Sequence, residues 1–223
     1  MSRVHDMGGR YGDGPVEPDD STEVFHEDWH ARALAVTLAA GGLGQWNLDM
    51  SRHARECLSP HDYMRLGYYE KWLAGLADLL VAQGVVTEEE LTGVPPKPSK
   101  LAERALQAQS VAQTLAKGGP ADRKSDETEQ FTPGDAVRTS AKSGNRFVPG
   151  GHTRLPTYAA GANGRVLRCH GAHVLPDSNA HGLGERPEPL YSVAFPASEL
   201  WPAPEHPDDE VVLDLWQSYL EPA

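Results

Sequence analysis

The apolar positions of residues 25–91 recur with the period of an α-helix. The first predicted helix ends at the Gly41-Gly42 pair, because paired glycines favour a helix stop. The positions near the helical period are Trp29, Ala33, Val36, Thr37 and Ala40. A second, short helix is predicted over residues 47–57, with Asn47 or Asp49 as its N-cap.

A third predicted helix has a strong start signal. Ser59, Pro60 and Asp62 supply a capping side chain, a proline at the first helical position and an acid in the first turn. The helix is predicted to continue to Gly84 along a wide apolar face. That face consists of Tyr68, Tyr69, Trp72, Leu73, Leu76, Leu79 and Leu80. Thr87 then opens another short helix with a capping box.

The segment that follows, residues 94–131, has a different character. The run Val94-Pro95-Pro96-Lys97-Pro98 predicts an extended linker. Residues 100–117 could form a helix, but the composition of residues 100–130 permits either a helix or a disordered excursion. Residues 118–129 are polar and rich in helix breakers, so we expect a loop there.

From Phe131 onward the apolar positions repeat every second residue, as on a half-buried strand. The predicted strands are Asp135–Thr139, Gly164–His170, Leu190–Phe195 and Val211–Trp216. Four or five short strands separated by Gly/Pro-rich loops favour a small, partly open β-barrel of the SH3 type. The predicted fold class is therefore α+β, with a helical N-terminal half followed by this barrel.

These changes of pattern divide the chain into four segments. Residues 23–93 form the predicted helical domain, residues 94–131 a linker with a possible helix, and residues 132–223 the barrel domain. Residues 1–22 are rich in Gly, Asp and Pro and cannot build a core of their own. They are either a disordered terminus or an extended arm that a partner orders.

The composition narrows the classes of partner. The formal net charge of −12 disfavours binding to nucleic acid or to an anionic membrane surface. No apolar run reaches the roughly 18 residues of a transmembrane helix, and the N-terminus lacks the apolar segment of a secretory signal. Two cysteines, Cys57 and Cys169, lie far apart in the sequence, which argues against a disulfide framework and favours a reducing cytoplasm.

One loop concentrates side chains of the types that bind metals. They are Cys169, His170, His173, Asp177 and His181. Zinc sites use such mixtures, and a free-standing zinc hydrolase is one hypothesis. However, neighbouring residues on a strand point to opposite faces, which leaves three ligands at best on a glycine-rich loop. We prefer an interface loop with hydrogen-bonding histidines and assign no metal ligand to this chain.

Short motifs are spread along almost the whole chain. They are His5-Asp6-Met7-Gly8-Gly9, Phe25-His26-Glu27-Asp28-Trp29, Pro60-His61-Asp62-Tyr63, Tyr68-Tyr69-Glu70-Lys71-Trp72, Gly151-His152-Thr153-Arg154, Glu188-Pro189-Leu190-Tyr191, Glu199-Leu200-Trp201 and Asp214-Leu215-Trp216. Each motif is weak alone, but in this order they resemble the β subunit of nitrile hydratase. The His170–Asp177 pattern resembles cobalt-type rather than iron-type members, and Asp28 stands where that family usually has glutamate.

The resemblance implies half of a lyase that hydrates nitriles to amides. In that family a non-corrin Co(III) or Fe(III) ion is held by the α subunit on a Cys-x-x-Cys-Ser-Cys loop, two of whose cysteines are oxidised. Nothing in this chain matches that loop, so cobalt, with iron less favoured, would be bound by the partner. The implied partners are a small-molecule nitrile and an α subunit, in an αβ pair or an (αβ)2 assembly. The chain would be inactive alone, and its N-terminal arm would wrap the α subunit.

The resemblance also implies two arginines of the site. Arg52 and Arg154 occupy the positions of the arginines that bond the oxidised cysteines in the family. A guanidinium suits this task because it stays charged and offers a planar fork of donors to anionic oxygens. Without the resemblance, both would be ordinary exposed residues.

The same resemblance implies a substrate pocket. Leu48, Tyr68 and Trp72 match positions that line it. Tyr68 would donate a hydrogen bond to the substrate or the metal-bound group, and Trp72 would form an apolar wall. Their spacing of four alone indicates only a shared helix face. Ser51 replaces a bulky apolar residue of some relatives, which implies a changed or roomier pocket.

Two other assignments compete with this one. A thiocyanate hydrolase is a related heteromeric enzyme, but there the β-like sequence is split over two chains, whereas residues 94–131 are continuous here. An SH3-like accessory protein or metallochaperone would be short and would lack the helical half that carries Arg52 and Tyr68.

Overall fold

The computed structural model describes residues 4–6, 18 and 21–223 of the chain. Of these, residues 4–6 and 120–223 form one compact unit, here called the sheet unit. Residues 18 and 21–119 form the other, here called the helical unit. Most of the predicted N-terminal arm, residues 1–22, lies outside the described residues.

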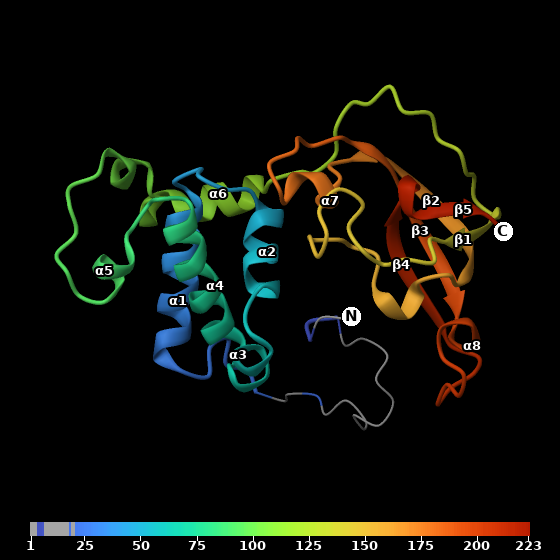
Figure 1. Ribbon diagram of the computed structural model, residues 1–223, viewed down its shortest axis with the longest axis horizontal. Coiled ribbons are helices and arrows are strands. Elements are labelled where there is room, and N and C mark those ends of the chain that lie inside the picture. The colour runs from blue at the N-terminus through green and yellow to red at the C-terminus, as the bar shows by residue number, and fades with distance from the viewer. Residues whose placement is uncertain (1–3, 7–17, 19–20) are drawn as a thin grey trace. The chain divides into compact units, whose positions relative to one another are not determined.

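The helical unit contains a series of helices, the first five joined by short connections and the last reached through a long segment (Figure 1). They are α1 (Asp28–Gly41), α2 (Leu48–Glu56), α3 (Pro60–Arg65), α4 (Tyr68–Ala82), α5 (Glu88–Leu91) and α6 (Val111–Lys117). The predicted caps are confirmed, since side chains of Asn47, Ser59 and Thr87 accept backbone N–H groups at 2.9, 3.0 and 3.2 Å. These bonds satisfy donors that the first helical turn leaves open.

The prediction of one helix from Ser59 to Gly84 is wrong. The chain leaves the helical conformation at Leu66, whose φ and ψ are −78° and 137°. Helix α4 then begins with Gly67 as its N-cap, and the Gly67 N–H donates to the Glu70 carboxylate at 2.6 Å. This local bond stabilises a new helix start inside a continuous apolar pattern, which the periodicity alone does not reveal.

Residues 100–117 are helical only in part. The α-helix is confined to Val111–Lys117, and two 3-10 turns, Lys100–Arg104 and Ala108–Ser110, precede it. Between the turns, the Leu106 N–H donates to the Ala39 carbonyl near the end of α1, at 3.3 Å. This bond to α1 takes Leu106 out of a continuous helical ladder, since its donor is used elsewhere.

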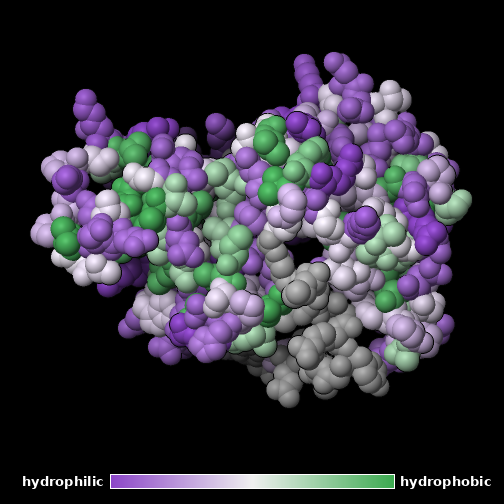
Figure 2. All heavy atoms as spheres, viewed as in Figure 1, coloured by the Kyte–Doolittle hydropathy of each residue, from purple (hydrophilic) through white to green (hydrophobic). Residues whose placement is uncertain are grey.

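Helix α4 packs against both α1 and α2, as Figure 1 shows for the three long helices. The buried apolar residues of this unit are Ala33, Leu43, Leu76 and Leu79. Figure 2 shows further apolar side chains at the surface over this unit, interspersed with polar ones. The helical unit therefore has a small core and an extensive apolar exterior.

The sheet unit is built on five antiparallel strands in the order β4-β3-β2-β1-β5. The strands are β1 (Ala136–Thr139), β2 (Asn163–His173), β3 (Glu188–Pro196), β4 (Glu210–Trp216) and β5 (Leu220–Pro222). The four predicted strands are confirmed, and β5 adds a fifth at one edge. Among the described strands β4 and β5 do not pair, so the sheet is open and the SH3-like barrel stays a prediction. Two short helices, α7 (Pro176–Asn179) and α8 (Ala197–Leu200), complete the unit.

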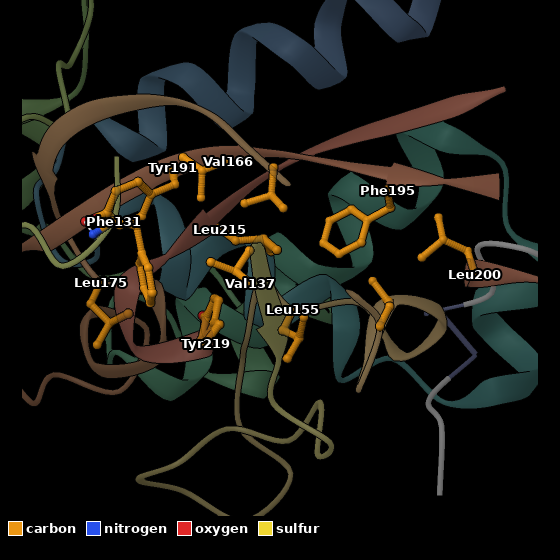
Figure 3. Close-up of a cluster of buried hydrophobic side chains, with 13 residues drawn as sticks. Phe131, Val137, Leu155, Val166, Leu175, Tyr191, Phe195, Leu200, Leu215 and Tyr219 are labelled. Carbon is orange, nitrogen blue, oxygen red and sulfur yellow. Dashed lines mark hydrogen bonds between the residues drawn. The ribbon is translucent and has the colours of Figure 1, made fainter. Parts of the chain in front are cut away.

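One hydrophobic core lies within the sheet unit (Figure 3). Its members are Phe131, Val137, Leu155, Ala159, Ala162, Val166, Leu175, Tyr191, Val193, Phe195, Leu200, Leu215 and Tyr219. A Cβ at Gly164 would lie 2.7 Å from both Phe195 and Val193, so this strand position accepts only glycine without a shift. Across the described residues of both units, no helix is long and apolar enough to cross a membrane.

Candidate functional site

Helix α2 presents several of the predicted site residues. Leu48, Ser51 and Arg52 are three and four positions apart, so they share one side of the helix. The Asn47 cap fixes where this helix begins. Leu48 is 61% exposed, while Ser51 and Arg52 are half-buried. Leu48 thus offers apolar surface and Arg52 offers a partly desolvated cation.

Arg52 is held by an acid one turn earlier. Its Nη1 donates to the Asp49 Oδ1 at 3.0 Å, and the Asp49 side chain is 9% exposed against 40% for Arg52. No described residue accepts a hydrogen bond from the other two nitrogens of the guanidinium. The buried carboxylate therefore orients the arginine and leaves part of its donor fork open to another anion.

Tyr68 and Trp72 lie on the first turns of α4. Their ring centroids are 5.5 Å apart, with the planes tilted by 46°. Tyr68 is 66% exposed, whereas Trp72 is half-buried, so this pair belongs to the surface of the unit rather than to its core. Tyr69 extends the cluster, with its centroid 5.2 Å from Tyr68 and 6.0 Å from Trp72.

The two helices approach closely at a glycine of α4. A Cβ at Gly75 would lie 2.8 Å from the Cγ of Arg55 and 3.1 Å from its backbone nitrogen. The Arg55 guanidinium lies over the Trp72 ring, with its Cζ 4.8 Å from the centroid. The structure thus places Leu48, Ser51 and Arg52 on a helix that packs directly against the helix of Tyr68 and Trp72.

Arg154 belongs to the sheet unit, where its side chain is exposed. Its backbone N–H donates to the Tyr219 hydroxyl at 3.2 Å, and the neighbouring Thr153 hydroxyl donates to the same oxygen at 3.3 Å. Three residues on, the Thr157 N–H donates to the Asp6 carboxylate at 3.0 Å. These bonds hold the backbone that carries Arg154 from both sides.

Tyr219 links the segment of Arg154 to a buried carboxylate. Its hydroxyl donates to the Asp177 Oδ1, and both residues are buried. Burial raises the pKa of Asp177, and burial together with the Asp177 charge raises the pKa of Tyr219 well above its usual value. In the sequence Asp177 was a candidate metal ligand and the end of the His170–Asp177 pattern, with no link to Arg154. No local sequence pattern predicts that Asp177, Tyr219 and the segment of Arg154 lie together, because they are far apart along the chain.

The histidine-rich loop does not form one cluster. The His170 Nε2 lies 2.7 Å from the Ser192 hydroxyl, His173 contacts the Gly171 carbonyl, and the His181 Nε2 accepts the His152 N–H at 3.0 Å. Burial raises the pKa of the Cys169 thiol, which disfavours the thiolate that metals bind. Among the described residues, no group of three or more His, Cys, Asp or Glu side chains is placed to hold a metal ion.

Arg55 belongs to the candidate site by its contacts, although the sequence did not single it out. It lies one turn after Ser51, and its Nε donates to the Ser51 carbonyl at 3.1 Å. Its position three residues beyond Arg52 and on a helix with Leu48 was a local signal. The contact with Trp72 could not be read from the sequence, because it depends on the packing of α2 against α4.

Comparison with known proteins gives one consistent family. The model of the nitrile hydratase β subunit N-terminal region matches residues 1–119, and that of its C-terminal region matches residues 120–222. The low-molecular weight cobalt-containing nitrile hydratase subunit beta of Rhodococcus rhodochrous is 35% identical over 230 aligned residues and covers all of both chains. The cobalt-containing nitrile hydratase subunit beta of Pseudonocardia thermophila is 34% identical, over 99% of this chain and 96% of its own.

A more distant relative covers less of the chain. The thiocyanate hydrolase subunit beta of Thiobacillus thioparus is 29% identical over 112 residues, which are 50% of this chain and 67% of that subunit. Its match ends within the chain, whereas the nitrile hydratase subunits align with the helical unit and the sheet unit together.

Proposed function

The chain belongs to the nitrile hydratase β-subunit family, and we propose that it is the β subunit of a heteromeric enzyme that hydrates nitriles to amides. The match of both family regions over residues 1–222 is the observation that carries this proposal. Such a subunit implies an α subunit as partner, and we infer an αβ pair that can double to (αβ)2. We infer a reducing cytoplasm as its location, because Cys57 and Cys169 are thiols rather than a disulfide.

Cobalt is the metal that the relatives' names support. The described residues of this chain offer no ligand set for it, so we infer that the α subunit holds the ion. When bound there, the ion would supply Lewis-acid activation of the nitrile. This chain would instead provide charge, hydrogen-bond donors and apolar walls around the reacting group.

Arg52 would bind an anionic oxygen of the oxidised cysteines in the partner. Its contact with Asp49 supports this role, because an arginine already oriented by a buried acid loses less conformational freedom when it binds. The open donors of the guanidinium would complete a charge-assisted hydrogen bond. Lysine would keep the charge but could not present the fork.

Arg154 would bind the second oxidised cysteine. Its exposed side chain is free of the core, while Tyr219 holds its backbone N–H at 3.2 Å. A rigid backbone under an exposed cation is the arrangement expected of a residue that meets a partner at a fixed point.

The substrate pocket would be lined from α2 and α4. Leu48 would contribute apolar surface, Trp72 an apolar wall, and the exposed Tyr68 hydroxyl a donor to the nitrile nitrogen or the metal-bound group. Ser51 would leave more room than the bulky residue of some relatives. The residues would act by positioning the nitrile and excluding water from it.

A thiocyanate hydrolase is the second candidate, and the match to the Thiobacillus thioparus subunit supports it. The two functions differ in substrate. A preparation that hydrolyses thiocyanate but leaves neutral nitriles unchanged would favour the second candidate.

The test is co-expression of this chain with its α subunit, followed by assays of amide formation and cobalt content. We expect activity and about one cobalt per αβ pair from the complex only, since one lyase centre needs one Lewis-acid ion. Arg52→Lys and Arg154→Lys should each lower kcat/KM by about tenfold or more, as expected for loss of a charge-assisted bond.

Arg65→Lys provides the matched control. Arg65 also pairs with an acid three residues earlier, at 2.8 Å from Asp62, but it is 57% exposed and lies outside the proposed site. Its variant should keep the kcat/KM of the parent complex. Equal losses in all three variants, or amide formation by this chain alone, would contradict the proposal.

A further inference from the structure

Arg55 combines a fixed position with an open set of donors. Its guanidinium lies over the Trp72 ring at 4.8 Å, and its Nε donates to the Ser51 carbonyl at 3.1 Å. Within the described part of the chain, no protein acceptor bonds its Nη1 or Nη2. The end of the side chain is therefore oriented by two contacts while its outer nitrogens stay available for a ligand.

The stem of Arg55 is confined by the neighbouring helix. Its Cγ lies where a Cβ of residue 75 would come within 2.8 Å, so α4 accommodates the stem only because Gly75 has no side chain. The arginine is half-buried, and burial lowers its pKa because the charged form loses water. The guanidinium nevertheless remains protonated at neutral pH, as arginine does throughout proteins.

The charges around Arg55 do not pair with it. Arg52 is bonded to Asp49 at 3.0 Å, and Glu56 contacts the His53 ring at 3.5 Å. Tyr68 when ionised and the Glu56 carboxylate favour the charged form of Arg55 from a distance, as does Tyr63 when ionised, whereas Arg52 opposes it. A half-buried cation without a hydrogen-bonded anion is a favourable site for an anion supplied by a ligand.

The residues around Arg55 also indicate which shape of ligand would fit. Trp72 contacts both Tyr68 and Arg55, because its ring centroid lies 5.5 Å from that of Tyr68 and 4.8 Å from the Arg55 Cζ. An aromatic surface followed by a planar cation suits a molecule with an apolar middle and a carboxylate end.

We propose that Arg55 determines specificity by binding the carboxylate of nitriles that carry one at the end remote from the cyano group. This rests on the proposed function, which places Tyr68 and Trp72 in the nitrile pocket. Trp72 holds the guanidinium over its ring, and the guanidinium donates from its outer nitrogens to the carboxylate oxygens. Neutral nitriles of the same length use the aromatic surface alone.

The test uses the αβ complex and two substrates of matched shape. These are 4-cyanobutanoate and pentanenitrile, which differ in a carboxylate against a methyl group. Arg55→Met keeps the stem over Trp72 and removes the charge, whereas Arg55→Lys keeps the charge and removes the fork. Arg65→Met, on the exposed arginine of α3, removes the same charge away from the site.

We expect Arg55→Met to lower kcat/KM for 4-cyanobutanoate by about tenfold to a hundredfold, chiefly through KM, and to spare pentanenitrile. Arg55→Lys should lie between this variant and the parent, and added salt should weaken only the charged substrate. Arg65→Met should leave the ratio of the two substrates unchanged.

Three outcomes would overturn the inference. Equal losses for both substrates would make Arg55 a structural contact between α2 and α4. Parent activity of Arg55→Met on both substrates would remove its role in specificity, although nitrile hydration itself would stand. A cobalt-loaded parent complex that hydrates neither nitrile would refute the proposed function, and the inference with it.

Discussion

The approach of α2 to α4 makes Gly75→Ala a direct test of how the site is held. An added Cβ would meet the Arg55 Cγ at 2.8 Å, its backbone nitrogen at 3.1 Å and its Cα at 3.2 Å. Two of these atoms belong to the backbone of α2, so a rotamer change in Arg55 cannot relieve all the contacts. Helix α2 must move, and Arg52 must move with it.

Two opposing terms set the size of the effect. Alanine in a helix interior is more favourable than glycine by about 1 kcal/mol. Overpacking a close helix contact costs about 1–3 kcal/mol. The sum is a net loss of up to about 2 kcal/mol in the free energy of unfolding, despite the better helix propensity.

The measurement is urea denaturation of the full chain followed by far-ultraviolet circular dichroism. With a slope of about 2 kcal/mol/M, a loss of about 1 kcal/mol moves the midpoint down by about 0.5 M. Gly41→Ala is the matched control, since Gly41 ends α1 and an added Cβ there has no atom within 4 Å. We expect that variant to be as stable as the parent or more stable, because only the propensity term remains.

The outcome that refutes the reasoning is specific. If Gly75→Ala shifts the midpoint upward like Gly41→Ala, the helices tolerate a methyl group and Gly75 does not set their separation. If it lowers stability as expected, the αβ complex should also lose nitrile hydration, because Arg52 and Arg55 share the displaced helix.

Two further perturbations test polar contacts. Tyr219→Phe should destabilise the sheet unit by about 1–3 kcal/mol in urea denaturation, because buried Asp177 loses its hydrogen-bond donor. Adding Asp177→Asn to that variant should restore part of the loss. Equal stability of the parent and Tyr219→Phe would contradict this prediction. Contacts with Cys57 and Glu56 raise the pKa of His53 from 6.5 to about 9. The stabilisation of the fold by protonated His53 is fully present below the pKa of 6.5 that this histidine has in the unfolded chain, and it is lost as the pH rises through 9. His53→Gln should therefore be less stable than the parent at about pH 6 and equally stable at about pH 10, and a difference independent of pH would contradict the assignment.

The sequence by itself determined the elements whose signals are local. The caps at Asn47, Ser59 and Thr87 lie within three residues of the N–H groups they bind, so a short window contains the whole interaction. The pattern of apolar positions likewise located β1 to β4, since burial alternates along β1 and β4, and β3 is an almost continuously buried run. The family motifs extended this to membership of the nitrile hydratase β-subunit family.

Several features were decided only by the tertiary structure. The helix expected from Ser59 to Gly84 broke at Leu66 and Gly67, where a bond to Glu70 stabilised a second start. The side chains of metal-binding type in residues 169–181 do not converge on one point, because Asp177 accepts a hydrogen bond from Tyr219 and His181 accepts one from the His152 backbone. The sequence shows that these residues are close along the chain, but it does not show the direction in which each side chain points.

The predicted pocket shows the same division. Leu48, Ser51 and Arg52 share a helix side by spacing alone, whereas the contact of Arg55 with Trp72 required α2 and α4 to meet at Gly75. Hydrogen bonds and periodicity within one helix depend on neighbours three or four residues away. Contacts between helices depend on the shape and burial of whole surfaces, which is why the tertiary structure alone brought Arg55 over Trp72.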